Sequence, residues 1–189
     1  MAAIERCDVC LLVIDAAEGI TEQDKKIAGV AHEAGKGIVV VVNKWDLIEK
    51  ETNTMRDFKR LIEAEMQFMS YAPSVFISVK DKQRVFQVIE MAKYVAEKRA
   101  MRVPTGQLNS LIADATMMKQ PPSDKGKRLK LYYITQAAVK PPTFVIFVND
   151  KELMHFSYTR YLENKIRDTF GFRGTALKFI IRERKEKEK

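Results

Sequence analysis

Four polar residues stand directly after an apolar run and have the chemistry to bind a heterocyclic base. Asn43, Lys44, Trp45 and Asp46 follow the run "GIVVVV". Such a run is typical of a buried strand, and α/β proteins bind ligands where their strands end. One carboxylate, that of Asp46, can accept hydrogen bonds from two adjacent donors, as the N1–H and 2-amino group of guanine are. Adenine presents an acceptor at the matching ring nitrogen, so the same carboxylate discriminates against it.

The neighbours of Asp46 can complete such a site. Asn43 can bond the edge of the base and brace the adjoining loop. The aliphatic stem of Lys44 can lie across the face of the base while its ammonium stays in water. Trp45 is expected to pack inside the protein rather than touch a ligand.

The elements that must position these side chains follow from hydrophobic periodicity. Residues 1–101 alternate between apolar runs of strand length and amphipathic segments of helix length. Strands are expected at 9–16, 37–43 and 74–79, and helices at 20–36, 52–71 and 84–100. Thr21 is the expected N-cap of the first helix, with Asp24 as its capping-box partner and Gly35 as its end. Continuous β-branched strands separated by helices predict an α/β fold with a parallel sheet covered on both faces.

The second half of the chain, residues 102–189, has a different pattern. A helix is expected at 106–118, strands at 129–139 and 143–150, a helix at 157–172 and a last strand at 176–183. The two middle strands are joined by "KPP", which favours an antiparallel pair. The order α-β-β-α-β predicts a separate small α+β domain.

The positive charge is concentrated in that second half. The chain has a net charge of +8, but residues 102–189 carry a net +9 and residues 1–101 a net −1. This asymmetry suggests an anionic partner for the second half, most often nucleic acid. The alternative is a solvated basic surface with a charged tail, "RERKEKEK". The candidate contacts to RNA are Lys127, Arg128, Lys130, Lys140, Arg167 and Arg173.

Two further features restrict the class of protein. No apolar run approaches the length of a membrane span, and the N-terminus lacks the pattern of a signal peptide, so a cytoplasmic location is expected. Cys7 and Cys10 form a C-x-x-C pair, but zinc needs four ligands and the two histidines are far away in sequence. We expect reduced cysteines that point to opposite faces of the first strand.

"NKWD" at the end of a valine-rich strand resembles the NKxD guanine-specificity motif of P-loop GTPases. "FISVK", residues 76–80, ends the next strand, where those GTPases carry a Ser-Ala-Lys-like loop. The resemblance implies that Ser78 orients Asp46 and that the amide of Val79 donates to guanine O6. It also implies that Lys80 covers the second face of the base.

Longer stretches resemble the Der/EngA family of bacterial ribosome-assembly GTPases. These stretches are "EGITEQDKKIAGVAHEAGKGIVVVVNKWD", "VKPPTFVIFVND" and "LMHFSYTRYLENKIRDTFGFRGT". The family has two tandem GTPase domains and a C-terminal KH-like domain. The resemblance assigns residues 1–101 to the end of the second GTPase domain and residues 102–189 to the KH-like domain. It implies GTP or GDP as ligand, Mg²⁺ in the whole protein, and rRNA of the large ribosomal subunit as partner.

The phosphate-binding motif of a GTPase is missing from this sequence. No G-x-x-x-x-G-K-[ST] loop and no D-x-x-G switch precede the first strand. We therefore expect no catalytic residue, no metal ligand, and no GTP hydrolysis by this chain alone. The first strand would have a free apolar edge, which favours self-association. The alternative function is a non-enzymatic rRNA-binding module whose first half is a scaffold.

"GFRG", Gly171 to Gly174, matches the GXXG loop with which KH domains hold nucleic acid. That loop joins two helices, whereas this segment joins a helix to the last strand. We therefore expect Gly171 to end the helix and Gly174 to form a turn. RNA binding would then depend on charge and shape.

Overall fold

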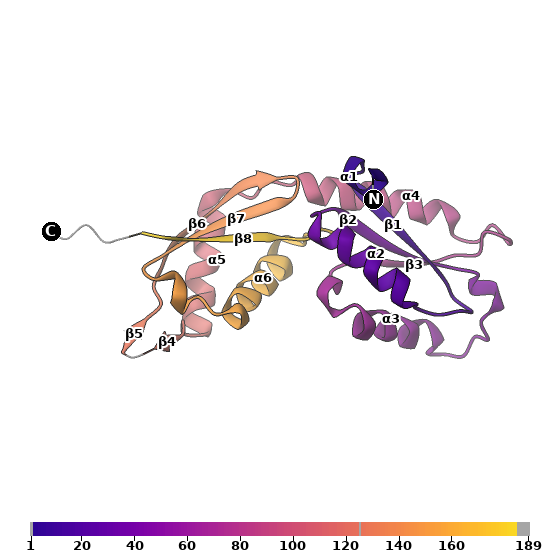
Figure 1. The fold of residues 1–189 in the computed structure, drawn as a ribbon, viewed down its shortest axis with the longest axis horizontal. Helices are drawn as coiled ribbons and strands as arrows, with labels where there is room; N and C mark the ends of the chain where they lie inside the picture. The colour runs from indigo at the N-terminus through magenta and orange to yellow at the C-terminus, as the bar shows by residue number, and fades with distance from the viewer. Residues whose placement is uncertain (1, 125, 185–189) are drawn as a thin grey trace. The chain divides into compact units, whose positions relative to one another are not determined.

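The computed structural model describes residues 2–124 and 126–184 and divides the chain into two compact units (Figure 1). Unit 1 consists of Met1–Arg99 and the later segment Phe172–Ala176. Unit 2 consists of Ala100–Gly171 and the residues from Leu177 onward. The predicted division between residues 101 and 102 assigns Phe172–Ala176 to the second half, whereas the structure places these five residues in unit 1.

Unit 1 is built on a parallel sheet in the order β1-β2-β3. The strands are β1 (Val9–Asp15), β2 (Gly37–Asn43) and β3 (Ser74–Phe76). The central strand β2 is buried along almost its whole length, as its valine run predicts, because each of its faces meets helices. Register places Asp15 beside Asn43, so β1 and β2 end side by side.

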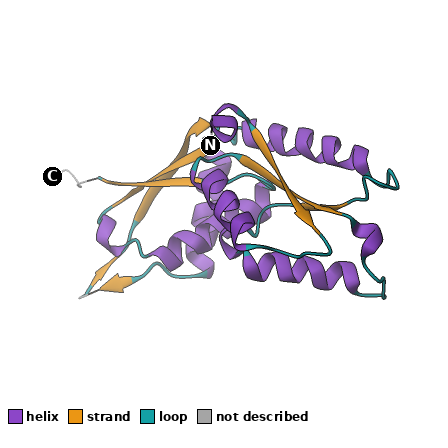
Figure 2. Cartoon of the chain, turned by 45° about the vertical axis from the view of Figure 1, so that its right-hand side comes forward, coloured by secondary structure: helices purple, strands orange, loops and turns teal. Residues whose placement is uncertain are grey.

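Helices cover both faces of this sheet, which confirms the predicted α/β class (Figures 1 and 2). On one face lie α2 (Glu22–Glu33) and α3 (Thr54–Glu65), with one core cluster. On the other lies α4 (Val85–Ala100), with a second cluster. The short α1 (Ala2–Arg6) precedes β1, and two 3₁₀ turns span Trp45–Leu47 and Gln67–Met69.

The ends of α2 follow the predicted capping chemistry. The Thr21 hydroxyl accepts a hydrogen bond from the Asp24 amide at 3.2 Å, and the Thr21 amide donates to the Asp24 carboxylate at 2.9 Å. This is the expected capping box. Gly35 follows the helix with φ +65°, a conformation that favours glycine.

Several predicted boundaries differ from the observed ones by two or more residues, and two of them show why. The third strand ends at Phe76 rather than at residue 79, because the chain turns at Ser78, whose N–H and C=O pair with Gln83. The helix expected to reach residue 71 ends at Glu65 and continues as the 3₁₀ turn Gln67–Met69.

The expected placement of the cysteines was also wrong. Cys7 lies before β1 begins, so strand alternation does not apply to it, and its Sγ lies 3.3 Å from the Sγ of Cys10. Both are free thiols. Burial, and then the neighbouring Cys7, raise the pKa of Cys10 to about 12, so this thiol stays protonated at neutral pH.

In the described part of the chain, β1 has β2 as its one neighbouring strand, as expected. Leu11 is 46% and Val13 57% exposed. Self-association through this edge stays a prediction.

Unit 2 has the predicted order α-β-β-α-β. Its elements are α5 (Thr105–Met118), β6 (Leu131–Val139), β7 (Pro142–Val148), a 3₁₀ turn (Lys151–Leu153), α6 (Phe156–Phe170) and β8 (Lys178–Glu183). In the sheet β6-β7-β8, the first pair is antiparallel, as predicted, and the second is parallel. A hairpin of β4 (Ser123–Asp124) and β5 (Lys127–Arg128), not predicted, precedes β6.

Buried apolar side chains and the amide side chain of Asn109 hold unit 2 together. Leu108, Phe144, Leu162 and Ile166 are all fully buried. The Asn109 side chain of α5 bonds both backbone groups of Ile134 at 3.0 Å, which fixes α5 along β6.

The segment Phe172–Ala176 is an integral part of unit 1. The carbonyl of Gly174 accepts from the Ile38 amide at 2.7 Å, and its amide donates to the Tyr71 carbonyl at 2.9 Å. Gly174 has φ +80°, and a Cβ built there would lie 2.3 Å from a methyl carbon of Val95. Glycine is therefore required both by the turn and by the close approach.

The "GFRG" sequence does not form a KH-type loop. Gly171 ends α6 with φ +93° and donates its amide to Arg167, and Gly174 lies in a turn, so both expectations are confirmed. Phe172, Gly174 and Thr175 are buried. Backbone that is buried in unit 1 cannot grip a nucleic acid as a GXXG loop does.

None of the helices in the described ranges is long and apolar enough to cross a membrane.

Candidate functional site

The carboxyl ends of β1, β2 and β3 lie at one edge of the unit 1 sheet, where loops carry polar side chains. A pocket of about 360 Å³ opens there. It is lined by Asn43, Lys44, Asp46, Leu47, Val79 and Lys80. The structure thus brings together five of the six predicted guanine-binding residues, and the sixth, Ser78, lies buried directly behind them.

The Asp46 carboxylate has an unused acceptor inside this pocket. Its Oδ1 is buried and, among the side-chain atoms of the described ranges, is the one buried oxygen or nitrogen with no hydrogen-bond partner. Leaving a buried acceptor unpaired is costly, and native proteins rarely do so without a functional reason. A ligand with donors aimed at Asp46 would satisfy it.

Asp46 is held in its ionised form. The neighbouring Ser78 side chain lowers the pKa of Asp46 below its usual value, with smaller contributions from Lys80 and Lys50. The Ser78 Oγ also accepts the Asp81 amide at 3.1 Å, which orients the hydroxyl. The role of Ser78 in orienting Asp46 toward a base, which the GTPase resemblance implies, stays a prediction.

Asn43 braces the neighbouring loop, as the sequence indicates. Its Oδ1 accepts the Val79 amide at 3.2 Å. The resemblance gives that same amide to guanine O6. In this structure the amide is already used, so binding of O6 would require Asn43 to release or share it.

Lys44 makes a contact that the sequence did not reveal. Its Nζ lies 2.5 Å from Oδ2 of Asp15, at the end of β1. The contact lowers the pKa of Asp15 and raises the pKa of Lys44. The contact arises from the parallel register, which places Asp15 beside Asn43 and so brings an acidic residue next to the lysine that follows β2. The sequence pattern does not contain this register.

The remaining motif residue, Trp45, packs in the core. It is 5% exposed and contacts Phe58 and Phe76 edge to face, with ring centroids 5.5 and 4.5 Å away. This confirms its expected packing role. The aromatic cluster anchors the turn that carries Asp46.

The described ranges contain no group of three or more His, Cys, Asp or Glu residues placed to hold a metal ion. The pocket lining combines the carboxylate acceptor of Asp46 with two lysines, Lys44 and Lys80.

The six candidate RNA contacts do not form one cluster. Lys127, Arg128 and Lys130 lie together on and after the β4–β5 hairpin, and all are exposed. Lys140 is at the far end of β6, about 30 Å along the strand from Lys130.

The two arginine candidates have other surroundings. Arg173 is exposed but belongs to unit 1. Arg167 is bonded to Glu163 through Nε and Nη2, at 2.9 and 2.7 Å, and its side chain is only 14% exposed. Its guanidinium is thus largely committed to that carboxylate.

Comparison with known proteins identifies the class. Residues 1–98 match the elongation factor Tu GTP binding domain, and the chain belongs to this family of GTP-binding domains. Residues 102–182 match the KH-domain-like, C-terminal domain of EngA bacterial GTPase enzymes. The predicted resemblance to the C-terminal part of Der/EngA GTPases is confirmed.

Similar curated proteins are GTPases of the same kind. GTPase Der of Agathobacter rectalis is 63% identical over 188 residues, and that of Alkaliphilus metalliredigens is 61% identical over 184 residues. The matches cover 100% and 97% of this chain, but the chain spans only 43% and 42% of the two relatives.

A solved structure of Aquifex aeolicus Era bound to GDP and aluminium fluoride shares 17% identity, with a TM-score of 0.42. That match covers 98% of this chain and 68% of Era. The similarity is too low to carry an argument.

Proposed function

We propose that this chain is the guanine-reading part of a bacterial GTPase that acts in assembly of the large ribosomal subunit. The observation that carries the proposal is the buried, ionised and unpaired acceptor of Asp46 in a pocket lined by Asn43, Lys44 and Lys80. The name of the relatives, GTPase Der, supports GTP or GDP as the ligand of the whole protein.

Specificity for the base would arise from complementary hydrogen bonds. The carboxylate of Asp46 accepts N1–H and the 2-amino group of guanine together. Adenine would place a lone pair against the carboxylate and leave it unpaired, which is strongly discriminating. The stem of Lys44, fixed by the contact of its ammonium with Asp15, covers one face of the base, and Lys80 covers the other.

The chemistry at the phosphates lies outside this site. The sequence has no Walker-type loop, so we expect this chain alone to bind the base weakly and to leave GTP intact. In the whole protein, Mg²⁺ and the phosphate-binding loop would be supplied by other parts of the chain. A cytoplasmic location fits such a role.

A series of nucleosides tests the base pocket. Guanosine should bind with a dissociation constant of about 1 mM, as expected for a small ligand held by a few hydrogen bonds. Inosine, which lacks the 2-amino group, should bind more weakly, and 1-methylguanosine and adenosine should not bind. NMR shifts of the Asp46, Val79 and Lys80 amides provide the measurement.

Equal binding of adenosine and guanosine, or shifts outside the pocket, would contradict the proposed base recognition. Nanomolar binding of GDP, or GTP turnover by this chain alone, would contradict the expectation that the phosphates are not held.

The alternative is that the chain acts as an rRNA-binding module without nucleotide binding. It is supported by the net charge of +9 on residues 102–189 and by the exposed group Lys127, Arg128 and Lys130. RNA affinity in that case should fall steeply as salt rises, because bound counterions are released. Affinity that is insensitive to salt would contradict it.

A further inference from the structure

The outer edge of β3 presents backbone groups that no strand of the described ranges uses. On the inner edge, the Pro73 carbonyl accepts from Val40 at 2.9 Å, and the Ile77 amide donates to Val42 at 2.8 Å. Alternate residues of a strand direct their backbone groups to opposite edges. The N–H and C=O groups of Ser74 and Phe76 therefore point away from β2, and the sheet order ends at β3.

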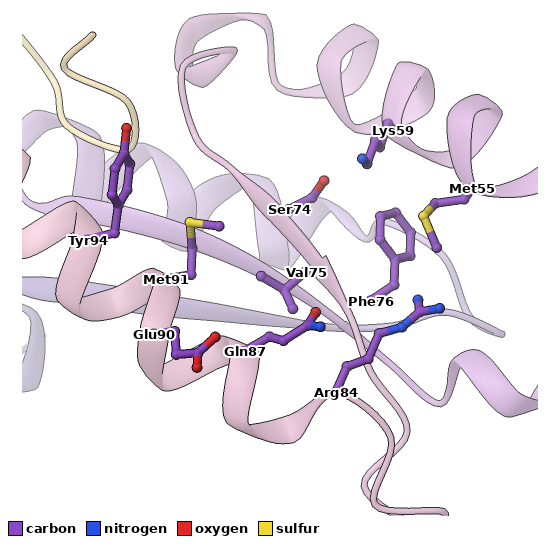
Figure 3. A pocket seen from close by; sticks show the side chains of 10 residues that line it. All are labelled: Met55, Lys59, Ser74, Val75, Phe76, Arg84, Gln87, Glu90, Met91 and Tyr94. Atoms are coloured by element: carbon purple, nitrogen blue, oxygen red, sulfur yellow. The ribbon is translucent and has the colours of Figure 1, made fainter.

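This free edge forms the floor of a groove between α3 and α4. The groove has a volume of about 550 Å³ and includes Ser74, Val75 and Phe76 (Figure 3). Met55 lies on the α3 side, and Met91 and Tyr94 lie on the α4 side. An added strand alternates its side chains between the two faces of a sheet, and here both faces offer apolar contacts.

The charges of the groove favour one kind of strand. Lys59 and Arg84 both lie around Phe76 (Figure 3), with the Lys59 Nζ 5.9 Å from the centroid of that ring. Both are exposed, and no ion pair involves either of them in the part of the chain that is described. Glu90 is the one acidic lining residue and lies further along α4 with Met91.

The backbone at Arg84 supports a formed groove. Arg84 has φ +56°, a left-handed conformation that costs a non-glycine residue energy and persists where the surroundings determine it. Its C-terminal neighbour, Val85, begins α4, and Figure 3 shows the Arg84 side chain near Phe76.

We propose that this groove binds an extended peptide segment of another protein, which adds a strand to the outer edge of β3. The segment has apolar side chains on both faces and a carboxylate that meets Lys59 and Arg84. The groove shares no lining residue with the guanine pocket, so this is a second, separate site.

A defined peptide tests the proposal on the full chain. The probe is the acetylated, amidated peptide Asp-Val-Val-Ile-Val, and its matched control carries N-methyl groups on alternate amides, which remove the donors needed for strand addition. Binding should shift the Ser74 and Phe76 amide signals in NMR and slow their hydrogen exchange. The N-methylated peptide should produce neither effect.

Two variants locate the binding. Ser74→Pro removes an outward N–H at an edge position where proline is tolerated, and it should abolish peptide binding while guanosine binding is retained. Arg84→Glu should weaken peptide binding by at least about threefold, as expected for an exposed charge pair. Lys93→Glu, an exposed α4 residue outside the groove, is the matched control and should have no effect.

Three results would overturn the proposal. They are no binding at 1 mM peptide (roughly the weakest affinity of interest), equal binding of the N-methylated peptide, and amide shifts away from β3. Sedimentation that shows concentration-dependent self-association, lost in Ser74→Pro, would instead assign this edge to a second copy of the chain.

Discussion

In the proposed function, recognition of the base depends above all on one carboxylate, that of Asp46. The valine run and the polar tetrapeptide predicted its position at the end of a buried strand, and the structure adds that one of its oxygens is buried without a partner. The local sequence pattern was sufficient to predict the position of Asp46, because a strand and the loop that follows it are adjacent in sequence. The Lys44–Asp15 contact was not predictable in the same way, because it depends on the register between two strands.

Replacing Asp46 should remove guanosine binding. Asp46→Ala loses the charge-assisted hydrogen bonds to two donors, so affinity should fall by about tenfold or more. Asp114→Ala, an exposed aspartate on α5, is the matched control and should bind guanosine as the unmodified chain does. Unchanged affinity in Asp46→Ala would exclude the carboxylate from base recognition.

The ionisation of Asp46 should depend on Ser78. The neighbouring Ser78 side chain keeps the pKa of Asp46 below its ordinary value, so the carboxylate is ionised at neutral pH and is protonated only as pH falls through the lowered pKa. In Ser78→Ala the midpoint should move upward, toward the ordinary aspartate value of about 3.9. NMR titration of the Asp46 carboxyl carbon measures this, and an unmoved midpoint would contradict the role of Ser78.

At the scale of elements, the sequence predicted the features that depend on neighbouring residues. It did not predict contacts between segments that are far apart in the chain. The capping box of α2 and the α-β-β-α-β order both follow from short-range patterns. The docking of Phe172–Ala176 against β2 and α4 does not, because its partners Ile38 and Tyr71 are more than 90 residues away in the chain. No periodicity records such a contact.

That docking predicts a sharp difference between two glycines. Gly174→Ala should destabilise unit 1 by about 2–4 kcal/mol, because it forces a positive φ and overlaps Val95. The melting temperature of a unit of this size should fall by at least about 8 °C. Gly106→Ala, in α5 with no atom within 4 Å of the added Cβ, should be neutral or stabilising.

Trp45, the one tryptophan of the chain, lies in unit 1, so its fluorescence reports the unfolding of that unit. The double variant Gly174→Ala/Val95→Ala separates the two costs. It should be more stable than the sum of the single changes indicates, because the clash is removed while the backbone strain remains. Strict additivity would show that the contact with Val95 is not the cause.

At the scale of the whole molecule, net charge differs between the two halves of the chain, −1 for residues 1–101 and +9 for residues 102–189. Composition alone predicted the basic half, since net charge needs no three-dimensional information. It could not predict which basic residues are available, and the structure removes Arg167 by pairing it with Glu163 and places Arg173 in unit 1.

If RNA binds to unit 2, the β4–β5 hairpin should carry the contact. Lys127→Ala/Arg128→Ala should reduce the slope of log affinity against log salt by about 1.4 for a dodecamer of uridylate, which corresponds to two lost phosphate contacts. Lys140→Ala, at the far end of β6, should leave the slope unchanged. An equal effect of both changes would show that the hairpin has no special role. Fluorescence anisotropy across a salt series provides the measurement.

The return of the chain to unit 1 at Phe172–Ala176 constrains the order in which the protein matures during synthesis. Residues 1–99 are synthesised before residues 172–176, so the backbone partners of Ile38 and Tyr71 become available only after α6 is complete. Unit 2 in turn lacks β8 until after that segment. Each unit is therefore completed only by residues that follow α6. A nascent polypeptide released at residue 171 would lack a piece of both units at once.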